Sequence, residues 1–172
     1  FVPSRGLGDV YKRQVEKDRR LGLSYVNRGC RAGDLEGCVT MAEMFEDGRW
    51  GTDMNLTRAF DLYKEACEGG SGPGCFHLGR LYDEGKGVPA NQREALTWYR
   101  RSCETDYGES CGRLAEKFRI GEGVVKSSRE SNRYLQLGCD NAHPESCGKL
   151  GGVYESGEQG LTRDMEQAAG FY

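Results

Sequence analysis

The chain has few of the features that mark membrane or nucleic-acid-binding proteins. No apolar run approaches the roughly 18 residues of a membrane helix, so we expect no bilayer span in this segment. Acidic and basic residues alternate without a basic run, and the formal net charge is −3, which argues against a nucleic-acid partner. With 37% hydrophobic residues, 26 Gly and only 4 Pro, the 172 residues fit poorly with one large core. The chain needs another means of staying folded.

The spacing of its cysteines reveals an internal repeat. The eight cysteines form four pairs with a spacing of eight, and successive first cysteines lie 37, 36 and 36 residues apart. The pairs are Cys30 and Cys38, Cys67 and Cys75, Cys103 and Cys111, and Cys139 and Cys147. Counted from each second cysteine, position +4 is small, namely Ala42, Gly79, Ala115 and Gly151. Position +7 is aromatic in every unit, namely Phe45, Tyr82, Phe118 and Tyr154.

This register predicts an all-α fold, because small or apolar residues at +3, +4 and +7 share one face of a helix. A Gly-x-Gly segment or its variant ends each first helix, and a polar cap begins the second. We expect first helices at 36–47, 73–84, 109–120 and 145–156. Second helices are expected at 16–30, 55–68, 91–104, 127–140 and 163–172. Stacked helix-turn-helix repeats of 36–37 residues predict a right-handed α/α solenoid.

The expected organisation is one solenoid over residues 15–172. It comprises a partial repeat at 15–35, repeats at about 36–72, 73–108 and 109–144, and a truncated repeat at 145–172. Residues 1–14 (FVPSRGLGDVYKRQ) depart from the pattern and look like a translated sequencing adapter, so we treat them as a non-native or disordered tail. The chain has no initiator Met and stops within an expected helix, so both natural ends are expected to be missing.

The stretch from Leu78 to Cys103 reads L-G-x-x-Y-x-x-G-x-G-V-x-x-N-x-x-x-A-x-x-W-Y-x-x-x-C. It resembles the Sel-one-like (SLR) repeat, a relative of the tetratricopeptide repeat, and the resemblance covers about 15–172. The C-x7-C spacing is further similar to the Helicobacter cysteine-rich protein family, in which the pairs form disulfides and the proteins are secreted. Departures are modest, and one is Ser131 in place of the usual alanine.

The cysteines have several possible uses. Each pair spans the end of one helix and the first turn of the next, which suits a disulfide and places the protein in an oxidising compartment, periplasmic or secreted. The mitochondrial intermembrane space is an alternative location. Reduced buried thiols are another possibility. We expect no metal or other cofactor, because a C-x2-C knuckle is missing and His77 and His143 occupy different repeat positions. Four equivalent pairs also fit structural bridges better than a redox site.

An enzymatic alternative comes from the family resemblance, because some cysteine-rich relatives carry the label of β-lactamase or penicillin-binding protein. The segment Ser146-Cys147-Gly148-Lys149 spells S-x-x-K, the pattern of an acylating serine and its lysine. The companion S-D-N and K-T-G motifs are missing from the sequence, and Ser146 falls on a repeat position. Ser146 and Lys149 are therefore weak catalytic candidates, for a weak β-lactam-binding protein or hydrolase.

Binding is the function that we favour, because first helices line an extended concave surface in the tetratricopeptide relatives. The same register selects six residues for contact with a protein or peptide partner: Glu43, Phe76, Arg80, Asp83, Glu116 and Arg119. Phe76 is the one clear apolar anchor among them, and the alternative is that Phe76 packs against an adjacent turn of its own chain. We expect a monomeric, extracytoplasmic scaffold of this kind.

Overall fold

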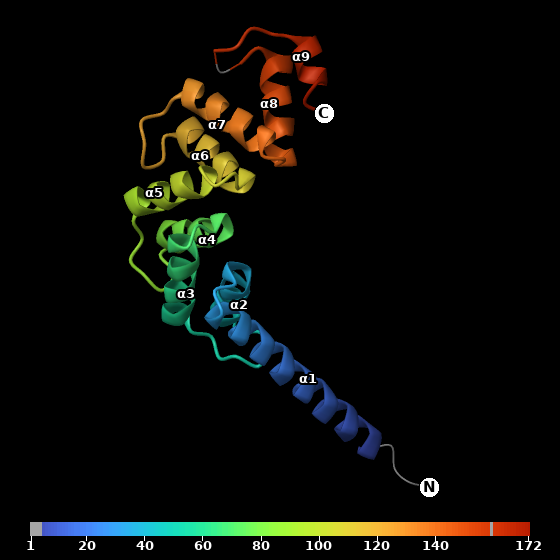
Figure 1. Cartoon of the computed structure of the whole chain (residues 1–172). Coiled ribbons are helices and arrows are strands. Elements are labelled where there is room, and N and C mark those ends of the chain that lie inside the picture. Colours follow the sequence, from blue (N-terminus) through green and yellow to red (C-terminus); the bar gives the residue numbers. More distant parts are fainter. Residues whose placement is uncertain (1–4, 159) are drawn as a thin grey trace.

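The computed structural model describes residues 5–158 and 160–172, and every regular element in these ranges is an α-helix (Figure 1). The helices are α1 (Arg5–Arg31), α2 (Leu35–Asp47), α3 (Leu56–Glu68), α4 (Gly72–Glu84), α5 (Gln92–Cys103), α6 (Gly108–Ile120), α7 (Ser128–Asp140), α8 (Pro144–Ser156) and α9 (Met165–Ala169). The predicted all-α solenoid is confirmed. From α2 onward, each predicted helix start agrees with the structure to within two residues.

The helices form hairpins that stack along a curved array. Figure 1 shows α2, α4, α6 and α8 following one another along the curve, with α3 and α5 on its outer side and α7 between α6 and α8. Each hairpin consists of a first helix on the inner side and the second helix that follows it in sequence. The inner side is therefore a continuous surface to which every first helix contributes.

The first and last helices differ from the sequence-based expectation. Helix α1 begins at Arg5, so residues 5–14 of the segment that we treated as a non-native or disordered tail are helical. Residues 1–4 of that segment lie outside the described residues. Once the helix predicted at 16–30 has formed, each added residue gains a backbone hydrogen bond, which favours extension. Helix α9 ends at Ala169, before the predicted 172. None of the helices in the described residues is long and apolar enough to cross a bilayer.

The ends of the first helices are set by glycine. Gly48, Gly85, Gly121 and Gly157 end α2, α4, α6 and α8 with φ values of 64°, 68°, 85° and 72°. This left-handed conformation is one that other residues adopt at a cost. The capping residue of the next helix then donates its backbone N–H to the carbonyl of the +7 aromatic residue. The donors are Asn55, Asn91, Ser127 and Asp164, at 2.7–2.9 Å.

All eight cysteines form disulfides between successive hairpins, with Cα–Cα distances of 4.5 to 5.0 Å. Each bridge links the end of one second helix, or of α1, to the first turn of the next first helix. The bonded pairs are Cys30 and Cys38, Cys67 and Cys75, Cys103 and Cys111, and Cys139 and Cys147. Because no cysteine remains as a thiol, none can serve as a zinc ligand or as a redox thiol in this state.

The second cysteines of the first three disulfides lie in the core. Cys38 is 1% exposed, and Cys75 and Cys111 are 0% exposed. The reason is the close crossing of the two bonded helices, to which the next hairpin adds cover: Asn141 Nδ2 lies 4.0 Å from Cys111 Sγ. Cys38 and Cys111 are therefore structural and cannot contact a ligand or partner. Only the last pair, Cys139 and Cys147, is half-buried at both cysteines.

We predict that replacing both Cys67 and Cys75 by alanine lowers the free energy of unfolding by about 2.5 kcal/mol, the chain-entropy value for so short a loop. The pair Cys139 and Cys147 closes a loop of equal length at a half-buried position and is the matched comparison. Urea unfolding of both double variants measures the effect. Equal losses would show that chain entropy dominates, and no loss in either variant would contradict the structural role of the bridges.

Candidate binding groove

The inner surface is organised around a polar contact that recurs where successive hairpins meet. We call the meeting of α2, α3 and α4 junction 1, that of α4, α5 and α6 junction 2, and that of α6, α7 and α8 junction 3. At junction 1 the Tyr63 hydroxyl donates to Glu46 Oε2 at 2.9 Å. Arg80 Nη2 donates to the same oxygen at 2.6 Å. Three helices thus contribute a tyrosine, an acid and a base to one contact, which we call the junction triad.

Junction 2 repeats this arrangement with other residues. The Tyr99 hydroxyl donates to Asp83 at 3.2 Å, and Lys117 Nζ donates to Asp83 at 2.6 Å. Gln92 adds a hydrogen bond to Asp83 at 2.9 Å and accepts one from Lys117 at 3.1 Å. Lys117 is buried, with 4% of its surface exposed, so its charge depends on these partners.

The last hairpin contains part of the same pattern. Tyr172 donates to Glu155 Oε2 at 3.2 Å, at a separation of 17 residues that equals the separation of Tyr63 and Glu46. Unlike the earlier pairs, this contact is exposed. The tyrosine and acid therefore pair in the same register at three places along the array.

Burial and charge shift the pKa values within the triads. Burial, and then the neighbouring carboxylate, raises the pKa of Tyr63 and of Tyr99, so both phenols stay protonated and donate. Burial alone would raise the pKa of Asp83, but hydrogen bonds from Lys117 and Gln92 outweigh it and hold that pKa below its usual value. Asp83 is therefore ionised at neutral pH, as an ion pair with Lys117 requires.

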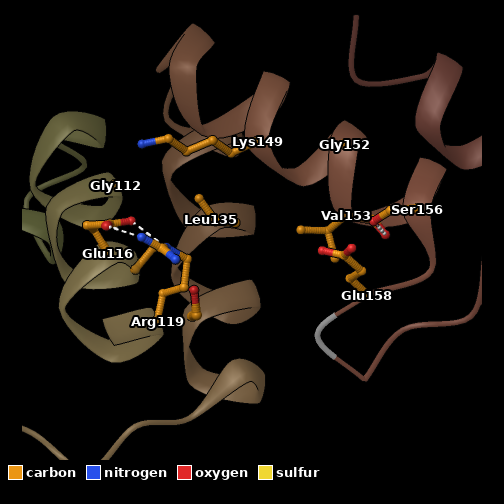
Figure 2. Close-up of a pocket in the computed structure, with 11 residues that line it drawn as sticks. Gly112, Glu116, Arg119, Leu135, Lys149, Gly152, Val153, Ser156 and Glu158 are labelled. Carbon is orange, nitrogen blue, oxygen red and sulfur yellow. Dashed lines mark hydrogen bonds and ion pairs between the residues drawn. The ribbon is translucent and has the colours of Figure 1, made fainter. Parts of the chain in front are cut away.

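Three pockets follow one another along the inner surface. The first has a volume of about 350 Å³ and is lined by Glu43, Glu46, Asp47, Arg49, Phe76, His77, Arg80, Glu109 and Arg113. The second has a volume of about 110 Å³ and is lined by Glu109, Gly112, Arg113, Glu116, His143, Glu145, Ser146 and Lys149. The third is the largest, at about 480 Å³, and lies at junction 3 (Figure 2). Adjacent pockets share lining residues, so together they form a groove.

His77 is the most strongly perturbed ionisable group of the first pocket. Burial, and then the charge of Arg80, lowers its pKa to about 4. Arg80 Nη2 lies 3.3 Å from Nδ1, which must accept because a guanidinium only donates. The remaining proton is then on Nε2, which lies 3.4 Å from Glu43 Oε1. At neutral pH the imidazole is therefore neutral, and its contact with Glu43 is not an ion pair.

Phe76 packs against an adjacent turn, which was the alternative to an exposed anchor. It is only 4% exposed, and its ring packs against Tyr99 and Tyr107 at centroid distances of 5.8 and 5.5 Å. The turn before α6 brings Tyr107 over the ring, and a helical face considered alone does not show this cover. Phe76 therefore helps to form the wall of the first pocket and is not free to insert into a partner.

The other five predicted contact residues have three kinds of surroundings. Arg80 and Asp83 are half-buried members of junction triads, so their charges are already paired. Glu43 is half-buried beside His77. Glu116 and Arg119 form a bidentate ion pair of 2.5 and 2.8 Å that borders the third pocket, as Figure 2 shows. The structure thus brings all six residues to the inner side of the array but leaves few of their charges unpaired.

A family model of the Sel1 repeat matches nearly the whole chain. The matched residues are 5–34, 36–71, 72–106, 108–143 and 144–172. The chain belongs to the Sel1 repeat family. No curated protein matches it.

Solved structures agree with this family. A Sel1 repeat protein from Oxalobacter formigenes is 20% identical with a TM-score of 0.77, over 96% of this chain and 67% of that one. A protective antigen of uropathogenic Escherichia coli strains, with an SLR fold, is 25% identical with a TM-score of 0.77, over 87% of this chain and 32% of the antigen. Helicobacter pylori cysteine rich protein B is 27% identical with a TM-score of 0.64, over 78% of this chain and 96% of that one.

Within this Sel1 array, Ser146 occupies a helix-packing position. It is 1% exposed, and its hydroxyl lies 2.8 Å from His143 Nδ1. Lys149 Nζ pairs with Glu145 at 2.6 Å. The equivalent Ser110 packs at the crossing of α5 and α6, where it bonds to Ser102 at 2.5 Å. The serine and the lysine of the S-x-x-K segment thus bond to other residues, Ser146 to His143 and Lys149 to Glu145.

Sequence reasoning missed the triad tyrosines and Lys117. Tyr63 and Tyr99 both lie four positions before a first cysteine, and Lys117 lies 34 residues after Asp83, as Arg80 does after Glu46. This recurrence was visible in the sequence. It gained meaning only once three helices were known to meet at each junction.

We predict that Glu46→Gln lowers the free energy of unfolding by about 2 kcal/mol, because it removes the charge that holds the buried ends of Tyr63 and Arg80. Glu155→Gln is the matched control, since this acid occupies the same register and also accepts from a tyrosine but is exposed. Its effect should stay within about 0.5 kcal/mol. Equal effects in urea unfolding would show that burial of the triad does not matter.

We also predict that the free energy of unfolding decreases as the pH is lowered from 6.5 to 4, because of His77. In this range the unfolded chain binds a proton that the folded imidazole, with its pKa near 4, does not take up. The loss amounts to roughly 3 kcal/mol. His77→Phe should flatten this part of the pH profile. A profile that is the same in wild type and His77→Phe would contradict the assignment.

Proposed function

We propose that this protein is an extracytoplasmic scaffold that binds a protein or peptide partner in the groove along α2, α4, α6 and α8. The observation that carries the proposal is the continuity of the groove. Glu109 and Arg113 line both the first and the second pocket. Glu116 and Lys149 line both the second and the third. An extended segment can therefore contact four successive hairpins, which is how solenoids gain affinity from many small contacts.

The charges of the groove support a partner with polar and charged side chains. Acids and bases line each pocket, and many are held in ion pairs, so non-specific attraction of one sign is weak. Arg113 is exposed and lines two of the pockets. It is therefore well placed to contribute to recognition of a partner, together with the exposed edges of Glu43, Glu116 and Arg119.

The disulfides support the proposed location. Four bridges in equivalent positions are favoured in an oxidising compartment such as the periplasm or the cell exterior, and reducing compartments disfavour them. The likeness to the Helicobacter pylori cysteine rich protein agrees with this proposal. Alkylation of the protein from its native cells without reductant, followed by mass measurement, should show no labelled thiol. Four or more labelled cysteines would refute an extracytoplasmic location.

Photo-crosslinking tests the groove. A photoreactive amino acid at position 43 or 116, on the inner side, should capture a partner from the native envelope fraction, whereas the same amino acid at Lys64 or Arg93 should not. We predict that Arg113→Glu reduces this capture at least about tenfold without altering the unfolding curve. Arg93→Glu is the control, because Arg93 is an exposed residue of α5 on the outer side. Equal capture from both sides, or none from the inner side, would refute the proposal.

A further inference from the structure

Junction 3 lacks all three members of the triad found at junctions 1 and 2. Leu135 occupies the tyrosine position of α7, and Arg119 occupies the acid position of α6. On α8, Gly152 is found at the position of Arg80. The pattern returns in the next hairpin, where Tyr172 donates to Glu155. Junction 3 is therefore a local exception in an otherwise regular part of the array.

The third pocket lies where the triad is missing. It is lined by Gly112, Ala115, Glu116, Arg119, Ser131, Leu135, Lys149, Gly152, Val153, Ser156 and Glu158. Ala115, Leu135 and Val153 are buried and form apolar walls. In Figure 2, Glu116 and Arg119 of α6 face Val153 and Glu158 across the pocket, with Leu135 between them. A volume of about 480 Å³ is in the range of pockets that bind ligands.

Junctions 1 and 2 show which side chains fill the equivalent site when the triad is present. At junction 1 it holds the ring of Tyr63, which is 0% exposed, and the side chain of Arg80. Leu135 is smaller than tyrosine, and a Cβ added to Gly152 would meet no atom within 4 Å. The pocket therefore has room for an aromatic ring and for a longer polar side chain. The protein itself supplies neither of them at this junction.

Three polar side chains line the pocket at junction 3 and can serve a ligand. Ser131 is only 1% exposed, and its buried hydroxyl has no hydrogen-bond partner among the described residues. Such a group is costly unless a partner is supplied. Arg119 uses Nε and Nη2 to bind Glu116, which leaves Nη1 for a further acceptor. Lys149 adds a second positive charge at the rim.

We propose that the pocket at junction 3 binds a partner segment that carries an aromatic side chain next to an acidic side chain. The ring occupies the place of Tyr63 or Tyr99 against Leu135, Ala115 and Val153. The carboxylate binds Arg119, so that the partner supplies the tyrosine and the acid of a triad and this chain supplies the base. This inference rests on the proposed function and specifies the partner for one part of the groove.

The probe is a fluorescently labelled hexapeptide with both ends capped and a central tyrosine–glutamate pair between glycine and serine residues. The capped ends leave the side-chain carboxylate as the only anion of the peptide. We expect saturable binding to the full chain, measured by fluorescence anisotropy. Leu135→Tyr, which fills the pocket as the two other junctions are filled, should weaken binding at least tenfold. Leu137→Tyr makes the same change at an exposed position of α7 and should leave binding unchanged.

The charge is tested separately. Replacing the glutamate of the peptide by glutamine, or Arg119 by glutamine in the protein, should each weaken binding about fivefold, and the two changes together should add little further. Replacing the tyrosine of the peptide by alanine should remove binding. No binding by the wild type, or equal binding by Leu135→Tyr, would overturn the inference. Crosslinking from position 43, in the first pocket, would then show whether the wider proposal survives.

Discussion

The disulfide that joins each second helix to the next first helix is the constraint on which the inner surface depends. With Cα atoms held 4.5 to 5.0 Å apart, the bridges fix how far one hairpin can rotate or slide against the next. Small residues beside the cysteines permit this approach, since a Cβ added to Gly74 would lie 2.8 Å from the Ala66 side chain. Equal register positions therefore recur at equivalent places along the groove.

The junction triads depend on this fixed position of each hairpin against the next, because the members of each triad come from three helices. A buried carboxylate such as Glu46 costs free energy unless both a hydroxyl and a cation reach it. If a hairpin were displaced by one helical turn, Tyr63 and Arg80 could not both bind it, and a buried charge would be left alone. The triads thus penalise incorrect stacking, while the disulfides and apolar contacts supply attraction. The small apolar core would not by itself enforce one specific stacking of the hairpins.

Much of the fold could be predicted because its signals are local. Glycine after each first helix and a polar cap such as Asn91 before each second helix set the boundaries within a few residues. The groove residues were harder to interpret. Arg80 and Asp83 are exposed on an isolated helix, but in the array Arg80 binds Glu46 of α2, and Asp83 accepts hydrogen bonds from Tyr99 of α5 and Lys117 of α6. The two alternatives for Phe76 could not be separated for the same reason, since the covering residue, Tyr107, comes from a following turn.

Junction 3 shows that stacking can be maintained without a triad. There α6 and α7 are joined by the stacked rings of Phe118 and Tyr134, whose centroids are 5.5 Å apart, and α7 is tied to α8 by Cys139 and Cys147. Because these contacts lie outside the third pocket, they hold the hairpins in phase without filling it. Loss of the polar contact then leaves a cavity of about 480 Å³ with walls that cannot collapse onto one another. An array whose junctions are stabilised in several independent ways can open one position for a ligand and keep its stacking.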